Sequence, residues 1–552
     1  MHRVALFLLA AAAACGDPGL RDRSLMAKLA SGTRGPIFTP SQTPSKKGVS
    51  QTSVIGLAPD QLAHYYPDDP SLVVRFKDVD SVGREASAEL ERIRKTLPGL
   101  ELPAGAPADM LRRALGLPDS VLIDPVRPFA FVRSEAGWAA ILPTRSSEKA
   151  PTRLRALDEI YCVAGDPAVV QAYRPGFRKG FYLPGDLSVI AAPAALPDLG
   201  ASLAPFLRPL GLDLAALDAW MPPCPPDIER LDLALRLQQG LLRIDLRAAP
   251  NRDSPTALYL DRMRPRPSGA VRWLPPRATA YVEFVSPLLD WEGLVGILLR
   301  GNAPPGGADE ERLLFSVRRL FGALGRDVAA VLHLVPQGPA TVLLVGEIED
   351  PAATAAFLDS ADLVALLAAA AGPDGALEWE PNAFEHRGVA VGMIRGNLSK
   401  SRLLAWRRSG DVLLSTVAVL ASGPVVVYTA IVGDKLCIAV GPKSRAEMEL
   451  LVEHVQRGAP ADNEHNAEVT TLFPQRLAAI SGDLGSLFDG CVEAAPYWNG
   501  NLAALRTASL CSAIPCSAAV TVEGGALRAA VNLRPALLAE ALARLREHLR
   551  TK

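Results

Sequence analysis

Two short groups of acidic residues and histidines are the side chains in this sequence best suited to acid–base or metal chemistry. The first group is Glu378, Glu380, Glu385 and His386, and the second is Asp462, Glu464, His465 and Glu468. Carboxylates and imidazoles can act as general acids and bases, and carboxylates also bind hard cations. Neither spacing matches a known metal motif, so we interpret both groups as solvated loops and expect no bound metal.

Motifs that carry a catalytic mechanism are missing from the sequence. It contains no His-Glu-x-x-His, Gly-x-Ser-x-Gly or P-loop sequence, and no Gly-x-Gly-x-x-Gly fingerprint. We therefore predict a non-catalytic protein without a cofactor. Because catalytic groups can be assembled in space, a hydrolase or metal-dependent enzyme that uses the region from Glu378 to His386 stays an alternative.

A basic segment with interleaved apolar residues could contact anionic groups. Its cations are Arg395, Lys400, Arg402, Arg407 and Arg408. Leucines and one tryptophan lie between them, a composition found on surfaces that touch lipid headgroups or polyanions. A surface hairpin or helix edge with cations lying along apolar surface explains the segment equally well. The formal net charge of -1, from 58 basic and 59 acidic residues, argues against a nucleic-acid partner.

The amino terminus has the composition of an export signal. Met1 to Ala14 has a short basic start, an apolar core from Val4 to Leu9 and an alanine run that ends at Cys15. An apolar stretch this short cannot span a bilayer as a mature helix, but it suits a signal peptide. The mature chain is therefore expected to leave the cytoplasm.

The end of this leader resembles a bacterial lipoprotein signal. Small residues, Ala13 and Ala14, precede Cys15, although Ala12 stands where that family usually has leucine. The resemblance implies lipidation of Cys15 after removal of residues 1–14. Because Gly16 replaces the aspartate that retains some lipoproteins at the inner membrane, it implies the outer membrane rather than the inner. Ordinary secretion with cleavage near the alanines is the alternative.

Seven cysteines are present, and lipidation of Cys15 would leave an even number for an oxidising compartment. Cys491 with Cys511 or Cys516 is the preferred disulfide, because all three lie in one region that contains Gly, Pro and Asn. Cys437 lies inside an apolar run and is predicted to be a buried thiol.

The most regular stretch runs from Pro275 to Gly458, where strand-like runs alternate with helical patterns. The predicted elements are a strand at Thr279–Phe284, a hairpin from Asp327–Val335 and Ala340–Ile348, a helix opened by Asp350-Pro351 and broken near Ser360, strands at 388–393, 425–431 and 435–440, and a helix opened by Ser444. Short hairpins interleaved with helices indicate an α+β fold with antiparallel sheets covered by helices on one face.

The earlier part of the chain repeats this order of elements. The alternating segment Leu231–Arg247 also superposes on Ala518–Asn532 without a gap, with leucines on one face and charged residues on the other. We therefore predict two related halves. The expected domains are a signal peptide at 1–14, a lipid-anchored flexible tether at 15–53, a first half at 54–264, a Pro/Arg-rich linker at 265–276 and a second half at 277–552.

These observations predict a lipid-anchored envelope protein that binds or scaffolds another envelope component. Its expected partners are the membrane, through the anchor, and an envelope protein or polymer. At the level of element order, most of the folded chain also resembles bacterial exported proteins of uncharacterised function, and this resemblance implies no site residues. A carrier of an apolar ligand held between the two halves is a further alternative.

Overall fold

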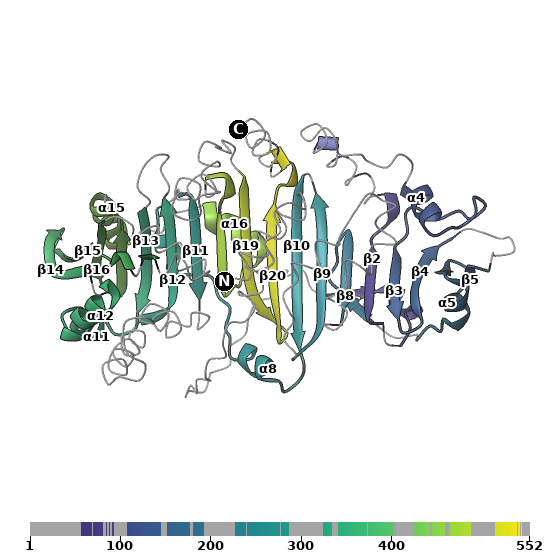
Figure 1. The fold of residues 1–552 in the computed structure, drawn as a ribbon, viewed down its shortest axis with the longest axis horizontal. Helices are drawn as coiled ribbons and strands as arrows, with labels where there is room; N and C mark the ends of the chain where they lie inside the picture. The colour runs from purple at the N-terminus through teal and green to yellow at the C-terminus, as the bar shows by residue number, and fades with distance from the viewer. Residues whose placement is uncertain are drawn as a thin grey trace. The chain divides into compact units, whose positions relative to one another are not determined.

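The computed structural model describes residues 57–80, 107–144, 152–192, 227–285, 324–333, 341–404, 424–458, 464–486 and 514–543, with short gaps inside these ranges and a few further residues between 84 and 92 (Figure 1). The chain divides into two compact units. Unit 1 takes its described residues from 57–262 and 522–543, and unit 2 takes them from 263–521. The predicted leader and tether lie outside the described residues.

Unit 1 is built on an antiparallel sheet with the order β20-β10-β9-β8-β2-β3-β4-β6-β5. Its strands are β2 Leu72–Phe76, β3 Phe129–Ser134, β4 Gly137–Pro143, β5 Leu154–Ala156, β6 Tyr161–Gly165, β8 Leu187–Ala191, β9 Ile228–Gln238, β10 Leu241–Pro250 and β20 Ala526–Leu533. β1 Ala58–Asp60 and β7 Gly180–Tyr182 form a separate pair. The helical elements are η2 Gln61–Tyr65, α4 Pro107–Ala114, α5 Pro167–Ala172 and α8 Pro255–Leu260.

Unit 2 is a second antiparallel sheet, with the order β19-β18-β11-β12-β13-β17-β16-β15-β14. Its strands are β11 Ala280–Val285, β12 Leu324–His333, β13 Thr341–Ile348, β14 Ala376–His386, β15 Val389–Asn397, β16 Val425–Val432, β17 Lys435–Val440, β18 Ala478–Asp483 and β19 Pro515–Glu523. Its helical elements are η5 Val271–Trp273, α11 Pro351–Leu358, α12 Ala361–Ala371, α15 Ser444–Arg457 and α16 Glu464–Leu472. The predicted α+β class with antiparallel sheets is confirmed.

Local sequence signals place the helix ends of unit 2 as predicted. The Asp350 side chain accepts a hydrogen bond from Ala353 N at 2.9 Å and begins α11. Ser360 interrupts the helical run and caps α12, because its hydroxyl accepts from Leu363 N at 3.3 Å. Gly372 ends α12 with a positive φ of 87°, which suits a residue without Cβ.

Among the described residues, no single helix has the length and apolar content of a membrane span. The pair formed by α11 and the first eight residues of α12 does reach that length and apolar content, with a 58° bend between the two helices.

The alternating segment Leu231–Arg247 forms a hairpin of β9 and β10, as its period-two pattern predicts, but its two faces are buried in an unexpected way. Leu233 pairs with Leu246, and Leu235 pairs with Ile244. The alternate positions carry charges, and there Asp232 and Asp245 are completely buried, whereas most leucines on the other face are only partly buried. The two aspartates of the charged face are therefore withdrawn from solvent.

Helices pack on both faces of each sheet. In unit 1, Leu111 of α4 joins the core around Leu72 and Val74, whereas α5 packs on Ala139 and Val163 at the opposite face. In unit 2, α15 covers one face, and Leu363 and Leu367 of α12 contact the other face at Trp379 and Ile394. Helices on one face, as expected from the sequence, describe only part of this arrangement, because strands such as Leu72–Phe76 are buried on both sides.

The predicted Pro/Arg-rich linker is an ordered part of unit 2. Ala270, Val271 and Leu274 are buried in the core beneath α15. The segment also forms a bridge between Arg266 and Arg476. Its prolines and arginines resemble a linker in composition, but the three apolar residues between them provide enough buried surface to fix it to the sheet.

Strand pairing follows the same order in the two units. β2 lies between β8 and β3, and β11 lies between β18 and β12. β4 pairs with β6 before α5, as β13 pairs with β17 before α15. Unit 2 has β14, β15, β16, α11 and α12 between β13 and β17. Derivation of the two halves from a common repeat stays a prediction.

Candidate functional site

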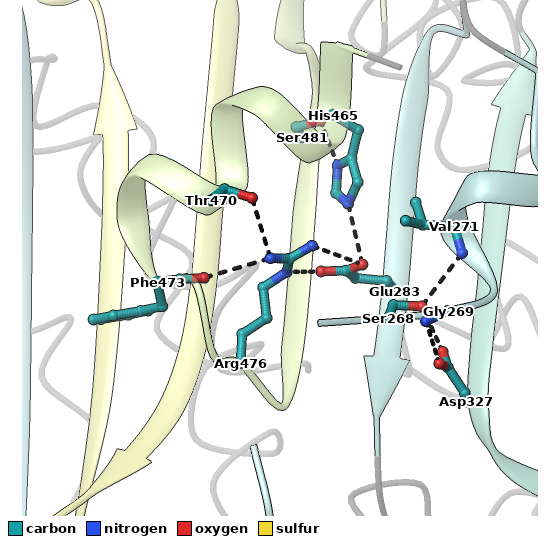
Figure 2. Close-up of polar contacts among 10 residues, drawn as sticks. All are labelled: Ser268, Gly269, Val271, Glu283, Asp327, His465, Thr470, Phe473, Arg476 and Ser481. Atoms are coloured by element: carbon teal, nitrogen blue, oxygen red, sulfur yellow. Dashed lines mark hydrogen bonds and ion pairs between the residues drawn. The ribbon is translucent and has the colours of Figure 1, made fainter. Parts of the chain in front are cut away.

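A buried polar network lies on the α15-covered face of unit 2, at the side of the sheet where α16 packs (Figure 2). Glu283 lies on β11, Ser481 on β18 and His465 on α16, and Arg476 lies in the connection from α16 to β18. Glu283 is 0% exposed, Arg476 and His465 are 1% exposed and Ser481 is 3% exposed. Three ionisable side chains are thus brought together out of contact with solvent.

Arg476 supplies most of the compensation for the buried carboxylate of Glu283. Its Nε donates to Glu283 Oε1, and its Nη2 lies 3.3 Å from Glu283 Oε2. Nη1 donates to the hydroxyl of Thr470 and the carbonyl of Phe473, each at 3.5 Å. The two side chains therefore form a forked ion pair, the geometry in which arginine binds a carboxylate most strongly.

His465 connects this ion pair to Ser481. His465 Nδ1 lies 2.6 Å from Ser481 Oγ, and His465 Nε2 lies 3.8 Å from Glu283 Oε2 (Figure 2). The ring stacks on Tyr281, with centroids 5.3 Å apart and an angle of 21° between the planes. The ring is therefore fixed by its polar neighbours at both nitrogens and by the aromatic contact.

The pKa of Glu283 reflects competing effects. Burial raises the pKa of Glu283, but the neighbouring imidazole of His465 and the hydrogen bonds and charge of Arg476 lower the pKa by more, so that the net change is downward. Glu283 is therefore the anion of the network in the folded protein.

Serine, histidine and a carboxylate are the groups of an acyl-transfer triad, but this arrangement does not provide that chemistry. The carboxylate is held by Arg476, and it lies 3.8 Å from the imidazole rather than within hydrogen-bond distance. Ser481 is also too deeply buried to meet a substrate. The network instead fixes α16 and the Arg476 segment to strands β11 and β18.

A second buried carboxylate holds the segment that the sequence suggests is a linker. Asp327 on β12 accepts hydrogen bonds from the hydroxyl of Ser268 and the backbone N–H of Gly269. Burial raises the pKa of Asp327, and these two hydrogen bonds only partly offset the effect. The carboxylate therefore ties residues 268–269 to the sheet beside the Glu283 network (Figure 2).

A pH dependence of opposite sign follows for the two carboxylates. Because the folded pKa of Glu283 lies below its unfolded value, its contribution to stability is present above about pH 4.3 and is lost as the pH falls through the folded pKa. The folded pKa of Asp327 lies above its unfolded value, so the ionised carboxylate destabilises the fold. This loss of stability develops as the pH rises through the raised pKa of Asp327. In urea unfolding, the stability difference between wild type and Glu283→Gln is expected to shrink towards acid pH. A difference that stays constant would contradict this assignment.

The structure places the two acidic groups singled out in the sequence in different environments. His465 was interpreted as part of a solvated loop, but it is a buried residue of α16. In the other group, His386 Nε2 lies 3.2 Å from Glu453 Oε1 on α15, and Glu378 pairs with Arg395 at 3.4 Å across β14 and β15. Asp462 lies outside the described residues. Within the described part of the chain, no three His, Cys, Asp or Glu side chains are grouped so that they could hold a metal ion.

The basic segment and the cysteines are only partly described. Arg395 lies on β15, and Lys400 is exposed just after it, whereas Arg402, Arg407 and Arg408 lie outside the described residues. Contact of these cations with a headgroup or polyanion stays a prediction.

Cys437 is a buried free thiol, as predicted, and burial raises its pKa to about 12. Cys516 is also a buried free thiol, on β19, so it forms no disulfide in this structure. Cys15, Cys491 and Cys511 lie outside the described residues, where the pair Cys491–Cys511 and the lipidation of Cys15 stay predictions.

Glu283, Asp327, Arg476 and Ser481 were not singled out from the sequence. A signal was present for Glu283, because a lone acid inside the apolar run from Ala280 to Val285 must either face solvent or find a buried partner. Its partner is 193 residues away in the chain, so local patterns could not have identified it.

Comparisons with known proteins identify no family. No family model matches this chain, and no curated protein matches it. Among solved structures, it is similar to crystal form I of TP0453, with 11% identity and a TM-score of 0.22, and to crystal form III of TP0453, with 9% identity and a TM-score of 0.24. Each comparison covers 50% of this chain and 98% of the other. Similarity at this level assigns neither a family nor a function to the chain.

Proposed function

We propose that this protein is a non-catalytic, lipid-anchored protein of the cell envelope that binds or scaffolds another envelope component. The leader that precedes Cys15 and the Gly-, Pro- and Ser-rich segment after it support export and anchoring, with the outer membrane favoured over the inner. A partner in the envelope, either a protein or a polymer, follows from that location.

The main observation in favour of a non-catalytic role is the burial of the Ser481, His465 and Glu283 group. These are the residue types that a hydrolase would use, yet each is at most 3% exposed, and Arg476 neutralises the carboxylate. Ionisable groups that are paired with each other inside a core stabilise or specify a fold rather than act on a substrate.

Anchoring is tested by replacing the cysteine that would be acylated. Wild-type protein expressed in a bacterial host and fed radiolabelled palmitate is expected to carry the label and to fractionate with membranes. Cys15→Ala is expected to lose both properties, and Cys516→Ala, which removes a buried thiol, serves as the matched control. Mass spectrometry of the mature amino terminus completes the test. An unmodified terminus elsewhere than residue 15 would exclude the anchor.

A scaffold without catalytic activity differs from the enzyme alternative in its response to changes near His386. Alanine at Glu385 and His386 is expected to leave the metal content and the cellular phenotype unchanged. Loss of the phenotype, in protein whose thermal unfolding is unaltered, would favour the hydrolase or metal-dependent enzyme instead.

A carrier of an apolar ligand is the second candidate. Strand β11 buries its glutamate completely and leaves Phe284 only partly buried on the opposite side. Burial of charge together with exposure of apolar surface is the reverse of the usual arrangement in a sheet with one solvated face. The partly exposed face is therefore the surface of unit 2 to examine for binding.

A further inference from the structure

Arginines and aspartates gather on one face of the β9–β10 hairpin in unit 1. The arginines are Arg230 and Arg236 on β9 and Arg243 and Arg247 on β10, and the aspartates are Asp232 on β9 and Asp245 on β10. Because the two strands are neighbours and these positions alternate with apolar residues, their side chains lie in one patch (Figure 1). We call this patch the arginine cluster of unit 1.

One carboxylate of the arginine cluster serves two arginines. Asp232 Oδ1 accepts hydrogen bonds from Arg230 Nη2 and Nε at 2.6 and 2.8 Å, and Asp232 Oδ2 accepts one from Arg247 Nη1 at 3.1 Å. Arg247 also lies directly opposite Arg528 on β20, and Arg528 is paired with Glu523. A single negative charge at Asp232 is therefore divided between two cations.

At the other carboxylate, the two arginines are not held equally. Arg243 Nε and Nη2 each donate to Asp245 at 3.0 Å, so that one guanidinium occupies both oxygens. Arg236 lies opposite Arg243 in the strand pairing, but its Nη2 is 3.9 Å from Asp245 Oδ2, which is too far for a hydrogen bond. Asp186 also attracts Arg236, but Asp186 is itself paired with Lys77 at 3.9 Å. Arg236 is therefore a cation that no carboxylate holds by a hydrogen bond in the described part of the chain.

Arg236 is fixed in place by a backbone contact. Its Nε donates to the carbonyl of Pro184 at 2.7 Å, and its Nη2 is buried without a hydrogen bond to the described residues. Burial lowers the pKa of Arg236, and the charges of Arg243 and Arg528 act in the same direction. The side chain as a whole is 26% exposed, so an ion in solution can reach it. A fixed, accessible cation beside other cations is a favourable position for an anion.

The charge balance of the cluster indicates the class of anion. Among its members, four guanidiniums face two carboxylates, which leaves an excess of two positive charges. A terminal phosphate group carries about −1.5 to −2 near neutral pH, whereas a carboxylate carries only one negative charge. The planar fork of a guanidinium also matches the spacing of phosphate oxygens. Both the charge and the geometry therefore favour a terminal phosphate over a carboxylate.

We propose that Arg236, with Arg243 beside it, binds a terminal phosphate group. The phosphate oxygens accept hydrogen bonds from Arg236, and the charge of Arg243 adds attraction while Arg243 stays on Asp245. The phosphate relieves the repulsion between two arginines that lie opposite each other in the sheet. This site does not depend on the envelope location proposed above.

Isothermal titration calorimetry tests the site directly. The full chain is titrated with inorganic phosphate in a chloride buffer of low, constant ionic strength, and saturable binding is expected that acetate does not reproduce. Arg236→Gln is expected to weaken the binding roughly tenfold, because a hydrogen bond between charged groups is lost. Arg445→Gln makes the same change at a side chain that is 60% exposed in unit 2, and it is expected to have no effect. The site is overturned if the wild type shows no saturable binding, or if Arg236→Gln binds as tightly as Arg445→Gln.

Chemical protection of the wild type covers the case in which Arg236→Gln fails to fold. Phenylglyoxal modifies accessible arginines, and peptide mass spectrometry measures the rate at each one. At the phosphate concentration that saturates the calorimetric signal, modification of Arg236 is expected to slow at least fivefold relative to Arg445. Saturable binding that gives Arg236 no more protection than Arg445 would place the phosphate elsewhere and contradict the assignment.

A second ligand distinguishes the two sources of a terminal phosphate. Vesicles of phosphatidylcholine that contain phosphatidic acid are mixed with the full chain carrying Cys15→Ser, so that its own anchor is absent. Sedimentation with these vesicles that is abolished by inorganic phosphate assigns a lipid phosphate to the site, whereas binding of inorganic phosphate alone assigns a soluble one. Either result supports the site. Lipidation of Cys15, which is measured separately, decides the proposed function whatever the outcome here.

Discussion

Replacing Glu283 by alanine is expected to lower the free energy of unfolding by about 3–5 kcal/mol, because Arg476 would then be a buried cation without its carboxylate. Arg476 is 1% exposed, and Thr470 and Phe473, which also accept hydrogen bonds from it, each lie 3.5 Å away. His465 would lose its carboxylate neighbour at the same time. Urea unfolding monitored by circular dichroism measures the loss.

The control for this prediction is an ion pair of the same residue types on the surface. Glu378 and Arg395 lie 3.4 Å apart across β14 and β15, and the side chain of Glu378 is 70% exposed. Glu378→Ala is expected to change stability by less than about 1 kcal/mol, because water screens exposed pairs. A loss below about 1 kcal/mol for Glu283→Ala would show that the Glu283 network does not carry the stability assigned to it.

A double replacement distinguishes a specific ion pair from general sensitivity at this position. Glu283→Leu combined with Arg476→Met removes both charges and keeps apolar volume, and buried pairs replaced in this way are often neutral in stability. The double variant is therefore expected to be more stable than Glu283→Ala alone. Equal losses in the two would indicate that packing, rather than an unpaired charge, determines the effect.

Asp245→Ala in unit 1 is expected to lower the free energy of unfolding by about 3–5 kcal/mol as well, because the partly buried side chains of Arg236 and Arg243 would lose the completely buried carboxylate between them. Arg243 Nε and Nη2 donate to the two oxygens of Asp245, each at 3.0 Å, and Arg236 Nη2 lies 3.9 Å from Asp245 Oδ2. Arg236 and Arg243 are direct partners across β9 and β10, and like charges in such a position destabilise a sheet. Thermal unfolding of the variant measures the effect.

Removing one of the two arginines together with the aspartate provides the internal check. Arg243→Leu in the Asp245→Ala background is expected to recover part of the stability, because it eliminates the repulsion with Arg236. Asp109→Ala, which breaks an ion pair with Arg112 where the aspartate side chain is 55% exposed, is the surface control. Failure of Arg243→Leu to recover stability would contradict the charge-based explanation.

These two predictions concern the same feature, which is that each unit holds ion pairs whose carboxylates are completely buried. In unit 1, Asp232 receives hydrogen bonds from Arg230 at 2.6 and 2.8 Å and from Arg247 at 3.1 Å. In unit 2, Glu283 receives hydrogen bonds from Arg476.

The sequence by itself determined several elements and their local ends, whereas Glu378 to His386, interpreted as a solvated loop, lie on strand β14. Period-two alternation predicted the hairpin from Leu231 to Arg247, and Asp350, Ser360 and Gly372 marked the ends of α11 and α12. Such features depend on residues a few positions apart, through capping hydrogen bonds and side-chain alternation, so they can be read from the chain directly. The predicted amino-terminal signal belongs to the same class of local pattern.

Tertiary structure decided which face of each strand is buried and which charges are paired. Alternation in Leu231–Arg247 separates leucines from arginines and aspartates, but it does not state that Asp232 and Asp245 are the residues to be buried. Glu283 and Arg476 are distant in sequence, and the apparent linker around Val271 becomes core only because α15 covers it. Burial and charge pairing depend on contacts between distant segments, so the polar network emerges only once the sheets are assembled.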